Sequence, residues 1–458
     1  MPSAYKEISY GICFRTETVM DKYLIKNGHL TDPANGIDGK MDILIYGGKV
    51  CEVAESISED SASATGAEII DASGKYIMPG FIDLHVHLRE PGFEYKETVM
   101  TGAQAAAKGG VTTICPMPNT NPVIDSPAMV MDLLERAKDA PVHILPVGAV
   151  TFGQEGVDIT DIAGMKEAGA VAVSEDGKSV MDSWLFSQAL HEAAEAGMPV
   201  FSHCEDTSLL DGGVMNYGAK SEELGLPGII NAVEDVIVAR DILLAKEAGC
   251  RLHLCHCSTA DSVILTEMAK KQGLPVTAEV CPHHFTMSDD EITEDDGRFK
   301  MNPPLRSRTD VDALKNGLKD GIMDVISTDH APHGAEEKAQ TMLKAPFGIV
   351  GLETSFALGY TVLVRGGYLT LSQLAAKMSV NPAKVIGIDK GNLAPGKAAD
   401  LVIADIDTEY EIDSSTFVSK GKNTPFNGMK VYGRIEKTFT DGKIVYDLYK
   451  EGKNWLKS

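Results

Sequence analysis

The residues best suited to chemistry lie in the segment 81–89, where His85 and His87 alternate with apolar residues and Arg89 follows two positions later. On a β-strand, residues i and i+2 point to the same face, so both imidazoles can bind one metal ion from one side. Arg89 continues this register and adds a cation. Two histidines on a strand are also typical of hydrogen-bonded core residues, so a metal site requires further ligands.

Later apolar runs end in polar residues that can supply those ligands. These residues are Asn119, Asp176, His203, His256, the pair His283 and His284, and Asp329. A set of imidazoles and carboxylates suits zinc and, less exclusively, Mn, Co or Fe. The predicted ligands are His85, His87, Asp176, His203, His256 and Asp329. One catalytic zinc needs about three protein ligands, so this set predicts one or two Zn²⁺ ions, with two expected and Asp176 bridging them.

The elements that must position these residues alternate in type from about residue 79. Short β-branched runs alternate with longer Ala/Leu/Glu-rich stretches, many of which end in Gly. The predicted strands are 81–88, 111–115, 143–150, 170–173, 199–203, 251–256, 275–280 and 323–327. The predicted helices include 97–108, 128–139, 184–196, 232–248, 260–271 and 311–318. Eight such units predict an α/β fold with a TIM-type (β/α)8 barrel over 79–381, in which the polar residues lie at the carboxyl ends of the strands.

The two flanks differ from this pattern. Residues 21–78 and 382–458 contain mainly short strands with Gly turns, which predicts one small β-sandwich-like domain assembled from both ends of the chain. Residues 1–20 fit neither part, and we predict a disordered N-terminal extension there.

The composition restricts the class of partner. The 458-residue chain has a formal charge of −24 and no basic cluster, which argues against nucleic-acid binding and favours a small-molecule substrate. No run approaches the roughly 18 apolar residues of a membrane span, and the first twenty residues have no apolar signal core. We therefore predict a cytoplasmic protein with reduced cysteines, including Cys255 and Cys257 as core residues rather than metal ligands.

Four motifs carry a resemblance to a known family. They are His85-Val-His-Leu-Arg-Glu-Pro-Gly92, Pro116-Met-Pro-Asn-Thr120, Lys300-Met-Asn-Pro-Pro-Leu-Arg306 and Ser327-Thr-Asp-His-Ala-Pro-His333. Their order and spacing over residues 20–445 resemble the bacterial class I dihydroorotases of the amidohydrolase superfamily. The resemblance implies that His85, His87 and Asp329 hold one zinc, that His203 and His256 hold the second, and that Asp176 bridges the two. Many relatives bridge with a carboxylated lysine instead, but Lys178 lies two positions beyond Asp176 and is interpreted as a loop residue.

The resemblance also implies a reaction and the residues that bind its substrate. The reaction is the zinc-dependent, reversible hydrolysis of (S)-dihydroorotate to N-carbamoyl-L-aspartate in pyrimidine biosynthesis. Zinc lowers the pKa of bound water from about 15.7 toward 7, so a metal-bridging hydroxide would attack the ring amide with Asp329 as the catalytic acid and base. The implied substrate-binding residues are His87, Arg89, Asn119 and His333, together with Asn302, Phe347 and Gly348 at the ring amide.

Two alternatives and two structural hypotheses accompany this interpretation. The chain could be an allantoinase or another cyclic amidohydrolase, or a non-catalytic partner of aspartate transcarbamoylase, although no ligand of the set is missing. The family also suggests a homodimer and, for an active enzyme, association with that transcarbamoylase. Because adjacent strand residues face opposite ways, only one of His283 and His284 is expected to face the site, in a supporting role. The polar segment 334–345 is a candidate lid.

Overall fold

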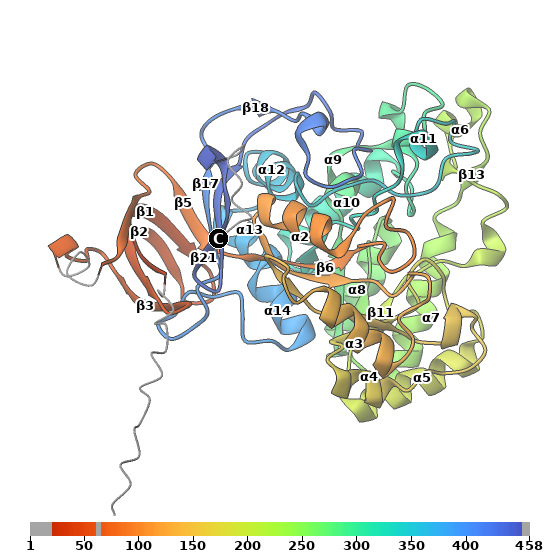
Figure 1. Cartoon of the computed structure of the whole chain (residues 1–458). Helices are drawn as coiled ribbons and strands as arrows, with labels where there is room; N and C mark the ends of the chain where they lie inside the picture. The colour runs from red at the N-terminus through yellow and green to blue at the C-terminus, as the bar shows by residue number, and fades with distance from the viewer. Residues whose placement is uncertain (1–20, 61–65, 451–458) are drawn as a thin grey trace, which may run out of the picture.

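Strands from both ends of the chain form one sheet at one side of the molecule (Figure 1). The computed structural model describes residues 21–60 and 66–450, so the predicted extension 1–20 lies outside the described part. The strands are β1 (Lys22–Asp32), β2 (Ile37–Tyr46), β3 (Lys49–Ala54), β4 (Glu68–Asp71), β5 (Tyr76–Pro79), β17 (Leu401–Asp405), β20 (Arg434–Thr440) and β21 (Lys443–Asp447). Their order is β21-β20-β17-β5-β1-β2-β3, with β4 beside β1. The sandwich-like unit predicted from the sequence is therefore one continuous, mixed sheet.

The middle of the chain supplies parallel strands at the predicted places. They are β6 (Phe81–Val86), β7 (Val111–Pro116), β8 (His143–Ile144), β9 (Val147–Ala149), β10 (Ala172–Ser174), β11 (Val200–Ser202), β14 (Leu252–Leu254), β15 (Val276–Val280) and β16 (Val325–Ile326). They form two sheets, β6-β7-β8 and β16-β15-β14-β11-β10-β9. The third predicted strand is divided into β8 and β9 at Pro146, which has no backbone N–H to donate. Every residue of β6 and β7 is buried, as expected where helices cover a parallel sheet.

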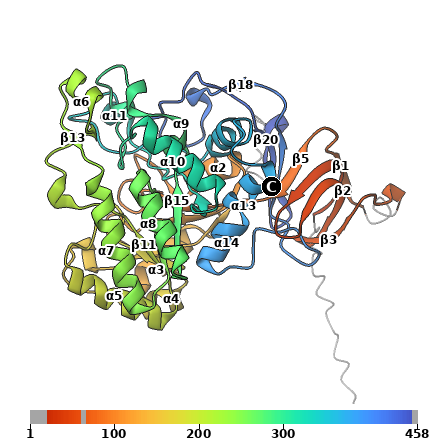
Figure 2. The same cartoon turned by 180° about the vertical axis from the view of Figure 1, so that it is seen from behind.

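The predicted helices are present and surround the parallel strands (Figures 1 and 2). They are α2 (Val99–Lys108), α3 (Pro127–Arg136), α5 (Ser183–Ala196), α7 (Ala232–Ala248), α8 (Ala260–Lys271) and α10 (Arg308–Lys319). Helices that the sequence patterns did not predict include α4 (Ile162–Ala168), α9 (Pro282–Thr286), α11 (Ala335–Lys338), α13 (Leu371–Met378) and α14 (Val380–Ile386). Local signals fix the ends: the Asp182 carboxylate accepts the free N–H groups that begin α5, and Gly197 ends it in the left-handed conformation.

The end of the first parallel strand is joined to the chain that follows the last one. The Leu84 N–H donates to Ser327 Oγ at 3.3 Å, and the His87 N–H donates to the His330 carbonyl at 2.8 Å. A parallel bridge also pairs Val86 with His330. These bonds bring the chain after β6 beside the chain after β16, although the two are more than 240 residues apart in the sequence.

The structure agrees with the prediction of reduced core cysteines. Cys255 and Cys257 are buried, unpaired core residues, and no disulfide occurs among the cysteines that the structure describes. Within residues 21–60 and 66–450, no helix combines the length and the apolar character that a membrane crossing needs.

Candidate metal and substrate site

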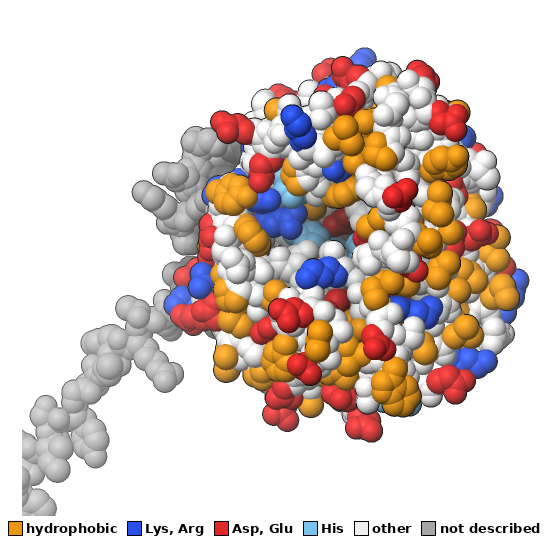
Figure 3. Space-filling model, turned by 90° about the vertical axis from the view of Figure 1, so that its right-hand side faces the viewer, with side chains coloured by type: hydrophobic (Ala, Val, Ile, Leu, Met, Phe, Trp, Pro, Cys, Tyr) orange, Lys and Arg blue, Asp and Glu red, His pale blue; other side chains and the backbone are white. Residues whose placement is uncertain are grey.

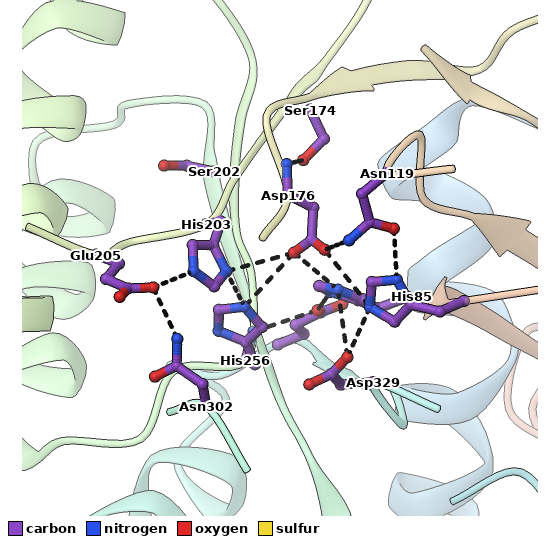
Figure 4. A network of polar contacts seen from close by, with 12 residues as sticks. His85, Asn119, Ser174, Asp176, Ser202, His203, Glu205, His256, Asn302 and Asp329 are labelled. Atoms are coloured by element: carbon purple, nitrogen blue, oxygen red, sulfur yellow. Dashed lines mark hydrogen bonds and ion pairs between the residues drawn. The ribbon is translucent and has the colours of Figure 1, made fainter. Parts of the chain in front are cut away.

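The six predicted metal ligands converge around the Asp176 carboxylate (Figure 4). Asp176 Oδ1 lies 3.1 Å from His85 Nε2, 3.4 Å from His203 Nδ1 and 3.8 Å from His256 Nε2. Its other oxygen, Oδ2, lies 3.4 Å from His87 Nε2. Asp329 Oδ1 completes the group at 3.0 Å from His87 Nε2. One carboxylate thus faces four imidazoles that come from three strand ends, those of β6, β11 and β14.

Buried carboxylates orient these imidazoles from behind. Glu279 on β15 accepts from His85 Nδ1 at 2.9 Å and from the His256 backbone N–H at 3.2 Å. Glu205 Oε2 accepts from His203 Nε2 at 2.7 Å. A carboxylate can only accept here, so the protons of His85 and His203 lie on the nitrogens that face away from Asp176. The nitrogens that face Asp176 are therefore the ones that would bind a cation, either a proton or a metal ion.

The electrostatics of the cluster favour positive charge at its centre. Burial disfavours the imidazolium, yet Asp176 raises the pKa of His85 well above its ordinary value. At His203, burial would lower the pKa, but Asp176 and Glu205 outweigh this effect and raise the pKa to about 10. Burial alone would raise the pKa of Asp176, but His85, His203 and His256 hold it well below the usual range. A site that binds protons this strongly is also suited to a metal cation.

A cavity of about 200 Å³ opens next to this cluster. Its walls include every predicted substrate-binding residue, namely His87, Arg89, Asn119, Asn302, His333, Phe347 and Gly348. Figure 3 shows the opening as a hollow where basic and histidine side chains gather and acidic side chains lie deeper. The cavity thus joins a cationic wall to the histidine and aspartate cluster.

Arg89 reaches the cavity by a route other than the predicted one. The strand β6 ends at Val86, and Arg89 lies in a loop with a φ of 61° instead of continuing the strand register. Its Nε donates to the Pro332 carbonyl at 3.2 Å, and no ion pair joins it to Glu90 or Glu94. His256 and Asp329 also have positive φ values, 33° and 47°. Strained backbone of this kind concentrates at functional sites, where the surrounding structure maintains it.

The wall beside Arg89 and His333 depends on a glycine and on a segment from far along the chain. A Cβ at Gly348 would lie 2.7 Å from the Cβ of Ala331, so only glycine lets the backbone pack this closely against that cavity residue. Residues 417–424, which we call the C-terminal strap, run beside this wall. In the strap, Asn423 Nδ2 donates to the Gly348 carbonyl at 3.0 Å, and Asn423 Oδ1 accepts the His333 N–H at 3.4 Å.

The prediction for His283 and His284 was wrong in its premise. Both lie in the short helix α9, after β15 has ended at Val280, so the alternation of a strand does not apply to them. His284 Nε2 donates to the Pro303 carbonyl at 3.0 Å. Burial lowers the pKa of His283 to about 4, so this imidazole is neutral.

Comparisons with known proteins agree with this geometry. Residues 74–262 match the family described as "Dihydro-orotase-like". A dihydroorotase of Pelotomaculum thermopropionicum is 49% identical to this chain over 424 residues. The aligned region covers 93% of this chain and 98% of that relative. A dihydroorotase of Bacillus cytotoxicus is also 49% identical, again over 93% of the chain and 98% of the relative. The chain belongs to the dihydroorotase family.

Solved structures place the family in a wider fold group. L-Hydantoinase (dihydropyrimidinase) from Arthrobacter aurescens superposes with a TM-score of 0.82 at 29% identity, covering 93% of this chain and 96% of the other. Dihydropyrimidinase from Brevibacillus agri gives a TM-score of 0.81 at 26% identity, and the superposition covers 93% of this chain and 95% of the other. This dihydroorotase-family chain therefore shares the α/β amidohydrolase fold.

The residues present fit the metal that the family implies. His85 Nε2 is buried and has no hydrogen-bond partner, although Asp176 lies 3.1 Å away in a poor orientation for a bond. An orphaned imidazole nitrogen at the centre of a histidine and carboxylate cluster is what a metal ligand requires. The donor set of four imidazoles and two carboxylates also suits zinc.

Sequence reasoning did not identify Glu205, Glu279, Lys96 and Asn423. Glu205 follows His203 by two positions, so the same spacing that singled out His85 and His87 could have found it. Glu279 and Asn423 gave no comparable signal, because Glu279 lies 194 residues from His85 and Asn423 lies 75 residues from Gly348 in the sequence. Lys96 lies only seven residues after Arg89, but nothing local indicates that it reaches His333.

Proposed function

We propose that this chain is a dihydroorotase, which hydrolyses (S)-dihydroorotate to N-carbamoyl-L-aspartate and closes the ring in the reverse direction. The observation that carries the proposal is the position of Arg89 in the same cavity as the histidine and aspartate cluster. Dihydroorotate is a cyclic amide with an exocyclic carboxylate. A guanidinium beside a hydrolytic centre matches that combination of groups.

The proposed ligands of the metal are the six residues of the cluster. His85, His87 and Asp329 would hold one Zn²⁺, His203 and His256 would hold a second, and Asp176 would contact both. When bound, zinc supplies a Lewis acid for the ring carbonyl and lowers the pKa of water. Lys178 is not part of the cluster, since its Nζ donates to the Gln154 carbonyl at 2.8 Å. We therefore propose Asp176, rather than a modified lysine, as the bridging ligand.

Asp329 is the proposed catalytic acid and base. Its carboxylate lines the cavity, as do Arg89 and His333, and it lies beside His87. Burial would raise its pKa, but the hydrogen bond from His87 and the charges of the nearby imidazoles lower it, so Asp329 starts as a carboxylate. It accepts the proton of the attacking water and delivers it to the ring nitrogen that leaves.

The remaining cavity residues orient the substrate. Arg89, Asn119 and His333 would bind the exocyclic carboxylate, with His87 below them. Asn302 Nδ2 donates to Glu205 Oε2 at 2.7 Å, which leaves Asn302 Oδ1 to accept from a ring N–H. The backbone of Phe347 and Gly348 would contact the rest of the ring amide edge.

The direct test compares hydrolysis of dihydroorotate, dihydrouracil and allantoin by the same preparation. We expect turnover of dihydroorotate alone, lost on chelation and restored by Zn²⁺. Equal or faster hydrolysis of allantoin would favour the allantoinase alternative, and absence of all turnover would favour a non-catalytic partner.

The position of equilibrium provides a second test. Hydrolysis creates a carboxylate and releases a proton, whereas ring closure consumes one. The ratio of dihydroorotate to N-carbamoyl-L-aspartate at equilibrium should therefore rise as the pH falls. A ratio that does not change with pH would contradict the assigned reaction.

The finer architecture and the association state are also proposals. We propose that both parallel sheets form one closed (β/α)8 barrel over 79–381, which the bridge between Val86 and His330 supports. Residues 21–78 and 382–458 would form the second domain. A homodimer in the cytoplasm and association with aspartate transcarbamoylase remain predictions, which sedimentation of the purified protein, with and without that partner, would test.

A further inference from the structure

The His333 side chain is held at both ring nitrogens. Lys96 Nζ lies 3.1 Å from Nδ1, and the Phe347 carbonyl oxygen lies 2.7 Å from Nε2. An ammonium group has no lone pair, so Lys96 must be the donor and Nδ1 the acceptor. A carbonyl can only accept, so Nε2 carries the ring proton. The two contacts are consistent with one neutral tautomer only, the one protonated at Nε2.

This proton lies beside Arg89, where a substrate carboxylate would share it with the Phe347 carbonyl. Arg89 Nη2 lies 3.3 Å from the same Nε2, and both side chains line the cavity. A neutral imidazole has one N–H, so the position of the proton decides whether His333 can donate to an anion beside Arg89. Burial, together with Arg89 and Lys96, lowers the pKa of His333 to about 2, which excludes the doubly protonated ring as the donor.

Lys96 itself is held in place by the loop that carries Arg89. The Phe93 N–H donates to the Arg89 carbonyl at 2.9 Å, and the Lys96 N–H donates to the Phe93 carbonyl at 2.8 Å. The Lys96 ammonium also pairs with Glu337 Oε1 of α11 at 3.3 Å. One compact turn therefore supplies both the cation that lines the cavity and the cation behind His333.

We propose that Lys96 is a positioning residue for substrate specificity, which holds His333 in the tautomer that donates from Nε2 beside Arg89 to a substrate carboxylate. The inference rests on the proposed function and deepens it. Lys96 does not line the cavity, so it acts through His333 rather than by contact with the substrate. Without Lys96 only the Phe347 carbonyl favours this tautomer, so the ring loses one of its two constraints and part of the population loses the donor.

The test uses Lys96→Met and Lys96→Gln in the full chain with Zn²⁺, assayed with dihydroorotate. Loss of a hydrogen bond to a charged group predicts a rise in KM of about 10- to 100-fold, with a smaller change in kcat. Lys96→Arg keeps a cationic donor and should recover much of the loss. Lys437→Met is the matched control, because Lys437 is similarly buried but pairs with Asp447 in the terminal sheet.

A second readout follows the tautomer directly. Nitrogen-15 spectra of histidine-labelled protein, with His333 assigned by comparison with His333→Asn, should show the Nε2–H form in the parent and a mixture in Lys96→Met. A parent protein that does not turn over dihydroorotate would contradict the proposed function, but the spectra would still show whether Lys96 determines the tautomer of His333. An active parent with either a KM for Lys96→Met within twofold of its own or an unchanged tautomer would overturn the role of Lys96.

Discussion

The two halves of the cavity are built in different ways. On the metal side, His85, Asp176, His203 and His256 lie at or just after strand ends, and buried glutamates from the next strand or the same segment orient them. On the carboxylate side, Arg89, His333 and Gly348 lie in loops that Lys96 and the C-terminal strap hold from outside. The metal side is therefore anchored directly at the strand ends. The carboxylate side can change without moving the metal ligands.

The largest effect is expected where the two halves meet, at Asp329. Asp329→Asn keeps the shape of the side chain but removes its capacity to accept a proton. Loss of a general acid and base predicts a fall in kcat of up to about 10⁴-fold. Steady-state rates of both hydrolysis and ring closure, together with zinc content, check this prediction. A variant that keeps more than a tenth of the parent kcat would exclude the assigned role.

Arg89→Ala separates the two halves most clearly. Removal of a guanidinium that binds the carboxylate through two charge-assisted bonds predicts a loss in kcat/KM for dihydroorotate of roughly 10²- to 10³-fold. The zinc content should stay at the parent level, because Arg89 contacts the Pro332 carbonyl and His333 but no metal ligand directly. Loss of zinc in this variant would show that the halves are not independent.

Glu279→Gln tests the metal side, because it should weaken zinc binding and leave substrate binding unchanged, the reverse of the result expected for Arg89→Ala. The amide retains its size and one acceptor oxygen for His85 and the His256 backbone, but it removes the negative charge and presents an N–H to His253 Nε2. Substitution of such an orienting partner predicts a 10- to 100-fold loss of zinc affinity, on the order typical of these sites. Titration of the apoprotein with Zn²⁺ measures it. At saturating zinc, KM for dihydroorotate should be nearly that of the parent, and a raised KM with unchanged zinc affinity would argue against this division.

The smallest predicted effect concerns the C-terminal strap. Asn423→Ala removes the bonds to the Gly348 carbonyl and the His333 N–H, and two ordinary hydrogen bonds predict a rise in KM of about tenfold. Asn427→Ala is the control, since Asn427 caps Ser414 away from the cavity. Equal KM values for the two variants would mean that the strap does not position this wall.

The difference between the metal side and the carboxylate side also explains what could be predicted from the sequence. The metal ligands follow apolar runs, and parallel strands gather their carboxyl ends, so the local pattern was enough to bring His85 and His203 together. The φ of 61° at Arg89 and the short helix that holds His283 depend on contacts after each strand ends, which no period-2 pattern records. The role of Asn423 depends on a segment about 75 residues beyond Gly348, and a single sequence does not indicate that contact.

The most direct test of a metal-dependent dihydroorotase is a zinc titration of the apoprotein, with dihydroorotate and dihydrouracil assayed at each point. We predict that dihydroorotate hydrolysis rises with bound zinc to a plateau at one or two ions per chain, while dihydrouracil is hydrolysed far more slowly throughout. Full activity in the metal-free protein, or equal rates on the two substrates at saturation, would contradict the link between the histidine and aspartate cluster and the Arg89 wall.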